Sequence, residues 1–180
     1  MRQDLRASRD TFVQNLSVQD SALAFSAVPS PLKNMLTAGK TVAGYIPVGS
    51  EASPLNLLSI ARAAGCIIAL PFVISKLAPM RFLAWEDGDD LHPGPFGLQQ
   101  PHETKQVLKP DIVLVPLIAF DRHLSRLGQG AGHYDRALSI MDDVVAIGVA
   151  WSVQEADMIP ADPWDIPLSA ILTEKEWISR

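Results

Sequence analysis

The chain has 180 residues, about the length of one domain, and 48% of them are apolar, which argues against disorder and provides enough core to fold without disulfides or metal ions. Its 15 basic and 20 acidic residues give a net charge of −5, which disfavours a nucleic-acid-binding protein. A single cysteine, a polar amino terminus without a signal peptide and the lack of an apolar run of about 18 residues predict a cytoplasmic protein with no membrane partner.

The first predicted elements are helical. Residues 3–16 place their apolar side chains on one face of a helix, with Arg2, Arg6 and Arg9 on or near the other. A second helical segment around residues 20–27 is interrupted by a Pro-Ser-Pro sequence and resumes over residues 32–36. We expect Gly39 to end this N-terminal helical region.

Strands alternate with helices from there on. The four apolar runs are continuous rather than alternating, which is typical of strands buried on both faces of a parallel sheet. A helix over residues 53–64 begins with Ser53 as N-cap and Pro54 at the first helical position, and a second connecting helix covers residues 134–141. The predicted strands are residues 41–46, 66–73, 112–117 and 144–150, with an edge strand at 170–172.

The segment between the second and third of these runs is different. Residues 80–85 are predicted to form a strand, and the acidic residues 86–90 a solvated turn rather than a metal site. The proline-rich stretch that follows is long for a loop, which is typical of binding loops and lids. The whole pattern predicts an α/β fold: a three-layer α/β/α sandwich with a mostly parallel central sheet, an N-terminal helical segment and one domain over residues 1–180.

The densest chemical signal lies in residues 121–136. Glycines at every second position from 128 to 132 let the backbone approach a ligand closely, and successive N–H groups in such a turn bind anions. Arg126 and Arg136 add positive charge on either side, and Asp135 is suited to a phosphate-bound Mg²⁺. The glycine spacing fits neither a Walker P-loop nor a dinucleotide-binding motif. We therefore predict a phosphate site beyond the carboxyl ends of the strands.

The same residues carry a family resemblance. Residues 111–121, followed by Arg-Leu-Gly-Gln-Gly-Ala-Gly-His-Tyr-Asp-Arg at 126–136, resemble the signature of the 5-formyltetrahydrofolate cyclo-ligase family. The resemblance covers nearly the whole chain. It implies an ATP- and Mg²⁺-dependent closure of 5-formyltetrahydrofolate to 5,10-methenyltetrahydrofolate, with release of ADP and phosphate. Weaker matches in the expected order are the basic N-terminal helix, Tyr45-Ile46-Pro47, Glu51, Pro71, Met80, Phe82, Phe96-Gly97, Pro101, Ile159-Pro160, Asp165 and Thr173-Glu174.

The resemblance also implies roles for individual residues. Arg126 and Glu51 are the implied catalytic residues, and Asp135 and Asp165 the implied Mg²⁺ ligands. The implied folate contacts are Ile46, Glu51, Met80 and Phe96 together with Gln129, Gly130, Ala131, Gly132 and His133. The implied ATP contacts are Arg2, Arg6, Arg126, Leu127, Gly128, Gln129, Gly130, Ala131, Gly132, His133 and Tyr134.

Departures from the family signature keep alternatives open. Gln129, Ala131 and His133 replace an aromatic residue, a glycine and a tyrosine, and Gln100 and Ser169 replace acids. A divergent relative that binds a nucleotide or folate without catalysis is one alternative, and a phosphosugar or acyl-CoA enzyme on a similar sheet is another. Taken alone, Arg2 and Arg6 are typical of a solvated helix face. In each case we expect small-molecule partners and a monomer or weak homo-oligomer.

Overall fold

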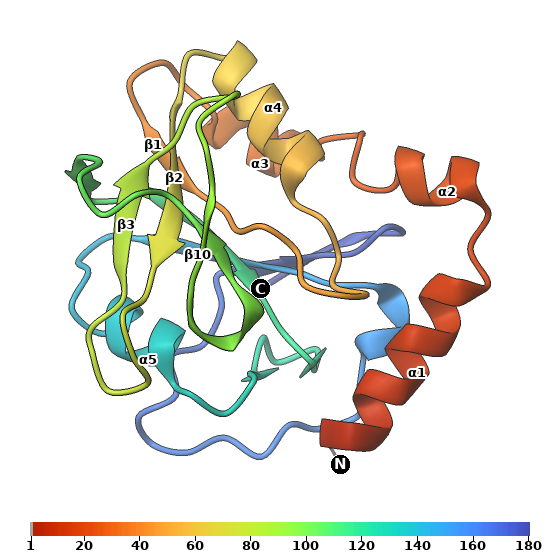
Figure 1. The fold of residues 1–180 in the computed structure, drawn as a ribbon. Helices are drawn as coiled ribbons and strands as arrows, with labels where there is room; N and C mark the ends of the chain where they lie inside the picture. Colours follow the sequence, from red (N-terminus) through yellow and green to blue (C-terminus); the bar gives the residue numbers. More distant parts are fainter. Residues whose placement is uncertain (1) are drawn as a thin grey trace.

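The computed structural model describes residues 2–180, which are built around one eight-stranded sheet (Figure 1). Its strand order is β12-β11-β10-β7-β1-β2-β3-β6. The strands are β1 (Thr41–Ala43), β2 (Ile67–Phe72), β3 (Arg81–Ala84), β6 (Val107–Leu108), β7 (Ile112–Pro116), β10 (Val145–Val149), β11 (Ala170–Leu172) and β12 (Trp177–Ser179).

The centre of the sheet is parallel, as predicted. β1 pairs in parallel with β2 and β7, and β10 pairs in parallel with β7 and β11, whereas β3, β6 and β12 are antiparallel to their neighbours. Residues 170–172 form the predicted strand, but the prediction that it lies at the edge of the sheet is wrong. A tight turn, in which the hydroxyl of Thr173 accepts hydrogen bonds from the backbone N–H groups of Lys175 and Glu176, returns the chain so that β12 covers that edge.

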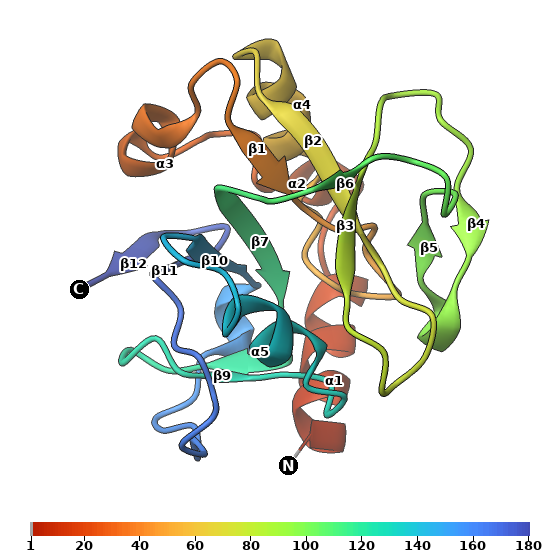
Figure 2. The same cartoon turned by 90° about the vertical axis from the view of Figure 1, so that its left-hand side faces the viewer.

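Helices cover both faces of the sheet and make the predicted three layers (Figure 2). On one face, Leu32 of α3 and Leu57 and Leu58 of α4 pack into a core that also holds Trp151. On the other face, Ala137 and Leu138 of α5 pack against β7 and its neighbours. The helices are α1 (Arg2–Gln14), α2 (Val18–Leu23), α3 (Ser30–Met35), α4 (Leu55–Ala63) and α5 (His133–Leu138), with short 3₁₀ turns η1 (Pro95–Gly97) and η2 (Ser152–Gln154).

Two predicted boundaries near α4 are wrong. The helix begins at Leu55, so that Pro54 rather than Ser53 is the N-cap residue, although the Ser53 hydroxyl still accepts a long hydrogen bond of 3.4 Å from the backbone N–H of Leu55. β1 ends at Ala43 instead of continuing to residue 46, because the chain leaves the sheet there. Gly44 allows this departure under α4, since a Cβ atom on it would lie 2.6 Å from Leu58 Cδ1.

The topology fixes where a ligand can bind. From β1 the chain passes through α4 to β2 on one side, whereas β7 lies on the other side of β1, so the sheet reverses its strand order between β1 and β7. In open α/β sheets ligands bind outside the carboxyl ends of the strands at such a point. Two small hairpins flank it: β4 (His92–Pro93) with β5 (Gln99–Gln100), and β8 (Ala119–Phe120) with β9 (Arg126–Leu127). Within residues 2–180, no helix has the length and apolar character needed to cross a bilayer.

Candidate active site

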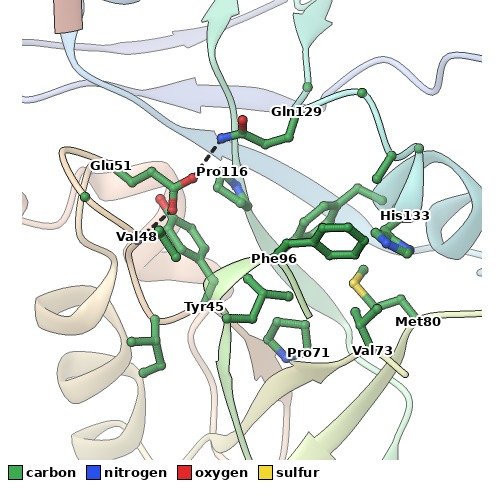
Figure 3. Close-up of a pocket in the computed structure, with 18 of the residues that line it drawn as sticks. Tyr45, Val48, Glu51, Pro71, Val73, Met80, Phe96, Pro116, Gln129 and His133 are labelled. Carbon is green, nitrogen blue, oxygen red and sulfur yellow. Dashed lines mark hydrogen bonds between the residues drawn. The ribbon is translucent and has the colours of Figure 1, made fainter. Parts of the chain in front are cut away.

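Two cavities lie side by side at this end of the sheet and share the loop of residues 128–132 as a wall. The first, which we call the apolar cavity, has a volume of about 610 Å³ and is lined mainly by Tyr45, Ile46, Pro71, Met80, Phe96 and Pro116 (Figure 3). The second, which we call the charged cavity, has about 630 Å³ and is lined by Arg2, Arg136, Asp162, Trp164 and Asp165 among others. Arg126, Asp135 and the glycine loop border both cavities.

Strand ends and the predicted binding loop form the apolar cavity. Ile46 follows β1 and Pro116 ends β7, so the cavity opens at the point where the strand order reverses. Met80 is buried, whereas Phe96 is 59% exposed and has a left-handed φ of 62°, a conformation that is costly for a bulky residue. The Phe96 ring lies 5.8 Å from the His133 ring, centroid to centroid, so these two side chains form one side of the cavity (Figure 3). The strained backbone therefore presents an aromatic face to a ligand.

The glycine loop has the free backbone donors that the sequence predicts. Gly130 and Gly132 have φ angles of 97° and 64°, so these two positions require glycine. Ala131 has an ordinary negative φ, as expected from its side chain. Along residues 128–132, the backbone N–H groups donate no hydrogen bond to any described residue. Five consecutive amides without a partner within residues 2–180 are available to an anion. α5 has only six residues, so the loop amides rather than a long helix dipole supply this positive potential.

Arg126 is the buried cation between the two cavities. Its side chain is 5% exposed, and its guanidinium forms an ion pair with Asp135 at 2.5 Å and donates to the carbonyl oxygen of Ile166. Burial lowers the pKa of Arg126 from its usual value, and the carboxylates of Asp135 and Asp165 oppose that shift. The group stays protonated in any case, because arginine is not deprotonated in proteins. A fixed positive charge thus borders both cavities.

A hydrogen-bonded chain of side chains crosses the apolar cavity. Gln129 Nε2 donates to Glu51 Oε1 at 3.0 Å (Figure 3). Arg6 donates in turn to Gln129 Oε1. The backbone N–H of Val48 donates to the other oxygen of Glu51 at 2.9 Å. Glu51 is therefore held as an acceptor that faces the cavity, and Gln129 has a defined role despite its departure from the family signature.

The comparisons with known proteins agree with this geometry. Residues 1–174 match the 5-formyltetrahydrofolate cyclo-ligase family. The chain belongs to this family. A 5-formyltetrahydrofolate cyclo-ligase from Mycolicibacterium smegmatis is 33% identical, with 82% of this chain and 80% of the relative covered. The relative from Haemophilus influenzae is 28% identical over 95% of this chain and 96% of its own length. The NMR structure of Aquifex aeolicus 5,10-methenyltetrahydrofolate synthetase superimposes with a TM-score of 0.73 at 28% identity, covering 99% of this chain and 92% of that one.

The predicted site residues of this cyclo-ligase family member fall into two groups. Ile46, Glu51, Met80, Phe96 and His133 all line the apolar cavity. Arg2, Leu127 and Asp165 line the charged cavity, and Arg2 Nε donates to the carbonyl oxygen of Gly128 at 3.0 Å. The two N-terminal arginines are separated, however, because Arg6 lines the apolar cavity rather than the charged one.

Sequence reasoning missed other lining residues. Arg9, Asp10 and Ser50 form one end of the apolar cavity, and Lys76 lies in its wall. The spacing of Arg2, Arg6 and Arg9 places all three on one helical face, which was an available signal for Arg9. Trp164, which is exposed, also lines the charged cavity.

The predicted Mg²⁺ ligands meet the chemical requirement for that ion. Asp135 and Asp165 both line the charged cavity, and Mg²⁺ is commonly held by one or two carboxylates together with substrate phosphates. Asp135 Oδ1 is paired with Arg126, and Asp165 Oδ2 accepts from the backbone N–H of Asp162. Their other carboxylate oxygens have no hydrogen bond to a described residue. Within residues 2–180, no cluster of three or more acidic, histidine or cysteine side chains offers a complete protein cage.

Proposed function

We propose that the chain closes 5-formyltetrahydrofolate to 5,10-methenyltetrahydrofolate with ATP, the folate occupying the apolar cavity and ATP the charged cavity. The observation that carries this assignment is the shared wall: the unpaired amides of residues 128–132 and the buried Arg126 border both cavities. A phosphoryl group that passes from one bound molecule to another requires donors reaching both sides. Family membership supports the same reaction.

The chemistry explains why ATP is needed. A formamide oxygen is a poor leaving group, so the γ-phosphoryl group of ATP is transferred to the formyl oxygen, which releases ADP. The nitrogen N10 of the same molecule then attacks the formyl carbon, the carbon–oxygen bond breaks, and phosphate leaves with both bonding electrons. Loss of the N10 proton completes the ring. The covalent tether already holds N10 near the carbon, so the protein need not provide a nucleophile.

Each part of the site has a role in this proposal. Arg126 and the loop amides bind the phosphoryl group as its charge shifts, and Arg2 binds the ATP phosphates from α1. Glu51 accepts hydrogen bonds from the pterin, while Met80 and Phe96 pack against its ring. Asp135 and Asp165 would hold Mg²⁺, which supplies charge neutralisation to the phosphates when bound. ATP as co-substrate and the single, buried thiol of Cys66 favour a cytoplasmic location.

A matched pair of substitutions tests the assignment of the two cavities. With Glu51→Gln, we expect the KM for 5-formyltetrahydrofolate to rise and the KM for ATP to stay near its wild-type value. With Asp165→Asn, we expect higher concentrations of ATP and Mg²⁺ to be required and little change in the KM for the folate. We choose Asp165 rather than Asp135 for the substitution, because Asp135 also pairs with Arg126.

The measurement is the absorbance of methenyltetrahydrofolate with and without ATP. ATP-dependent product supports the proposal, and the reverse pattern of KM changes would exchange the two cavities. Folate or nucleotide binding without product would favour the alternative of a non-catalytic relative.

A further inference from the structure

Arg9 has a buried donor that no group within residues 2–180 satisfies. This residue on α1 is 5% exposed and lines the apolar cavity. Its Nε donates to Ser50 Oγ at 2.9 Å, and the Ser50 hydroxyl donates in turn to Asp10. Its Nη1 is buried and has no hydrogen-bond partner among the described residues. A charged donor left unpaired away from water is costly, so it points to an acceptor that arrives with a ligand.

The position of Arg9 is fixed from several sides. The carbonyl oxygen of Ser50 accepts from Trp151 Nε1 at 3.0 Å, and the buried Tyr45 hydroxyl donates to the carbonyl oxygen of Ala52. These bonds hold the short segment of residues 50–52 that anchors Arg9. Because Ser50 directly precedes Glu51, the arginine donor and the glutamate acceptor lie at the same end of the cavity. Burial raises the pKa of Tyr45, and Glu51 and Arg9 then act on it in opposite directions, which agrees with both charges lying near this tyrosine.

We propose that Arg9 determines specificity for a pterin with a 4-oxo group by donating a hydrogen bond from Nη1 to that oxygen. The inference rests on the proposed function, because it places the folate in the apolar cavity. The pyrimidine edge of such a pterin carries N–H donors beside the oxo acceptor. Glu51 offers only acceptors, which match the donors, and each of its oxygens has one protein hydrogen bond and so retains accepting capacity. Glu51 therefore recognises the N–H groups of this edge, including the N3–H that accompanies the 4-oxo form, but as an acceptor it makes no hydrogen bond to the oxo oxygen itself.

Arg9 distinguishes an oxo group from an amino group at position 4 by direct contact. An oxo group satisfies its Nη1, whereas a 4-amino group would place a donor against a donor and leave the buried guanidinium unpaired. A site built to bond one polar group rejects analogues that leave its buried groups unpaired. Arg9 and Glu51 together thus recognise both the oxo acceptor and the N–H donors on the pyrimidine edge.

The test compares the binding of two reduced folates. The probes are 5-formyltetrahydrofolate and its 4-amino-4-deoxy analogue, with dissociation constants measured by the change in tryptophan fluorescence. We expect the wild-type protein to prefer the oxo compound by about tenfold to a hundredfold. Arg9→Met keeps the length of the side chain but removes the donor, so this preference should fall by about tenfold or more. Arg9→Lys should retain part of it.

Arg62→Met is the matched control. Arg62 also has a buried nitrogen without a hydrogen-bond partner among the described residues, but it lies over the Trp85 ring and lines neither cavity. A general loss of packing would weaken the binding of both ligands equally and leave the ratio of their dissociation constants unchanged. An unchanged ratio in Arg9→Met overturns the inference.

Turnover separates this inference from the proposed function. Wild-type turnover with an unchanged ratio in Arg9→Met overturns the role of Arg9 alone. A changed ratio without wild-type turnover overturns the catalytic function and keeps the role of Arg9. Failure of the wild-type protein to bind either folate overturns both.

Discussion

The β8–β9 hairpin places two arginines in opposite electrostatic situations. At the turn, Arg122 is exposed and forms hydrogen-bonded ion pairs with two acids, Glu155 and Glu176. At the start of β9, the side chain of Arg126 is buried and pairs with one acid, Asp135. The hydrogen bonds that Arg122 donates to Glu176 and Glu155 raise the pKa of Arg122, whereas burial lowers the pKa of Arg126.

This difference shows which positive charge is available to a ligand. Two acids, Glu155 and Glu176, pair with Arg122, and these ion pairs connect three surface segments. Arg126 has a single carboxylate partner and a carbonyl oxygen, in a place where solvent screens little. A phosphoryl group beside it therefore gains more than it would at the more numerous ion pairs of the turn. The count of ion pairs on an arginine says little about its part in binding.

The largest expected effect comes from removing the buried charge. In Arg126→Ala, turnover should fall by about 10²–10³-fold, the usual consequence of losing one donor that stabilises transition-state charge. Arg122→Ala is the control, because it removes an arginine four positions away that borders neither cavity. The turnover of both variants is measured as the steady-state rate of methenyltetrahydrofolate formation at saturating ATP. Equal losses in the two variants would mean that Arg126 acts only through the fold.

The sequence predicted the regions where local pattern determines structure. β2, β7 and β10 are continuous apolar runs because both faces of the sheet are covered, so their residues carry the signal themselves. β12 was missed because its three residues form a strand only by pairing with β11 across a turn. The glycine loop was recognisable because backbone geometry and phosphate binding both require particular residue types there.

The missed part of the site depends on distant contacts. Arg9 reads as a solvated residue on a polar helix face, and it becomes buried only because Ser50 and Trp151 pack against α1 from far along the chain. The separation of Arg2 and Arg6 into different cavities likewise follows from where the glycine loop meets the helix. The spacing within α1 places these arginines on one helical face, but it does not show which distant residues they contact.

A smaller effect is expected at His133, which lies beyond the base of the hairpin. Burial and then the nearby Arg136 lower the pKa of His133 below 6.5, its ordinary value. The folded state thus takes up a proton less readily than the unfolded state. Above pH 6.5 both states are neutral and this contribution to stability is complete, whereas it declines as the pH falls below 6.5 toward the lowered pKa. His133→Tyr, which restores the family residue, should lose less stability between pH 7 and pH 5.

Urea unfolding at the two pH values measures this difference as the shift in midpoint. His123→Tyr is the control, since His123 is exposed in the surface turn and lines neither cavity. An identical pH dependence in the wild-type protein and His133→Tyr would contradict the proposed burial of a neutral imidazole.

The smallest effect is expected at the surface end of the hairpin. Arg122→Ala should lower the thermal midpoint slightly, because exposed ion pairs contribute little to stability and are screened by salt. The difference from the wild-type protein should shrink when the NaCl concentration is raised from 0.1 M to about 1 M, where the Debye length falls to about 3 Å. A large difference that persists in salt would show that Arg122 stabilises the junction of the three segments by fixed geometry rather than by charge, and the contrast with Arg126 would then rest on burial alone.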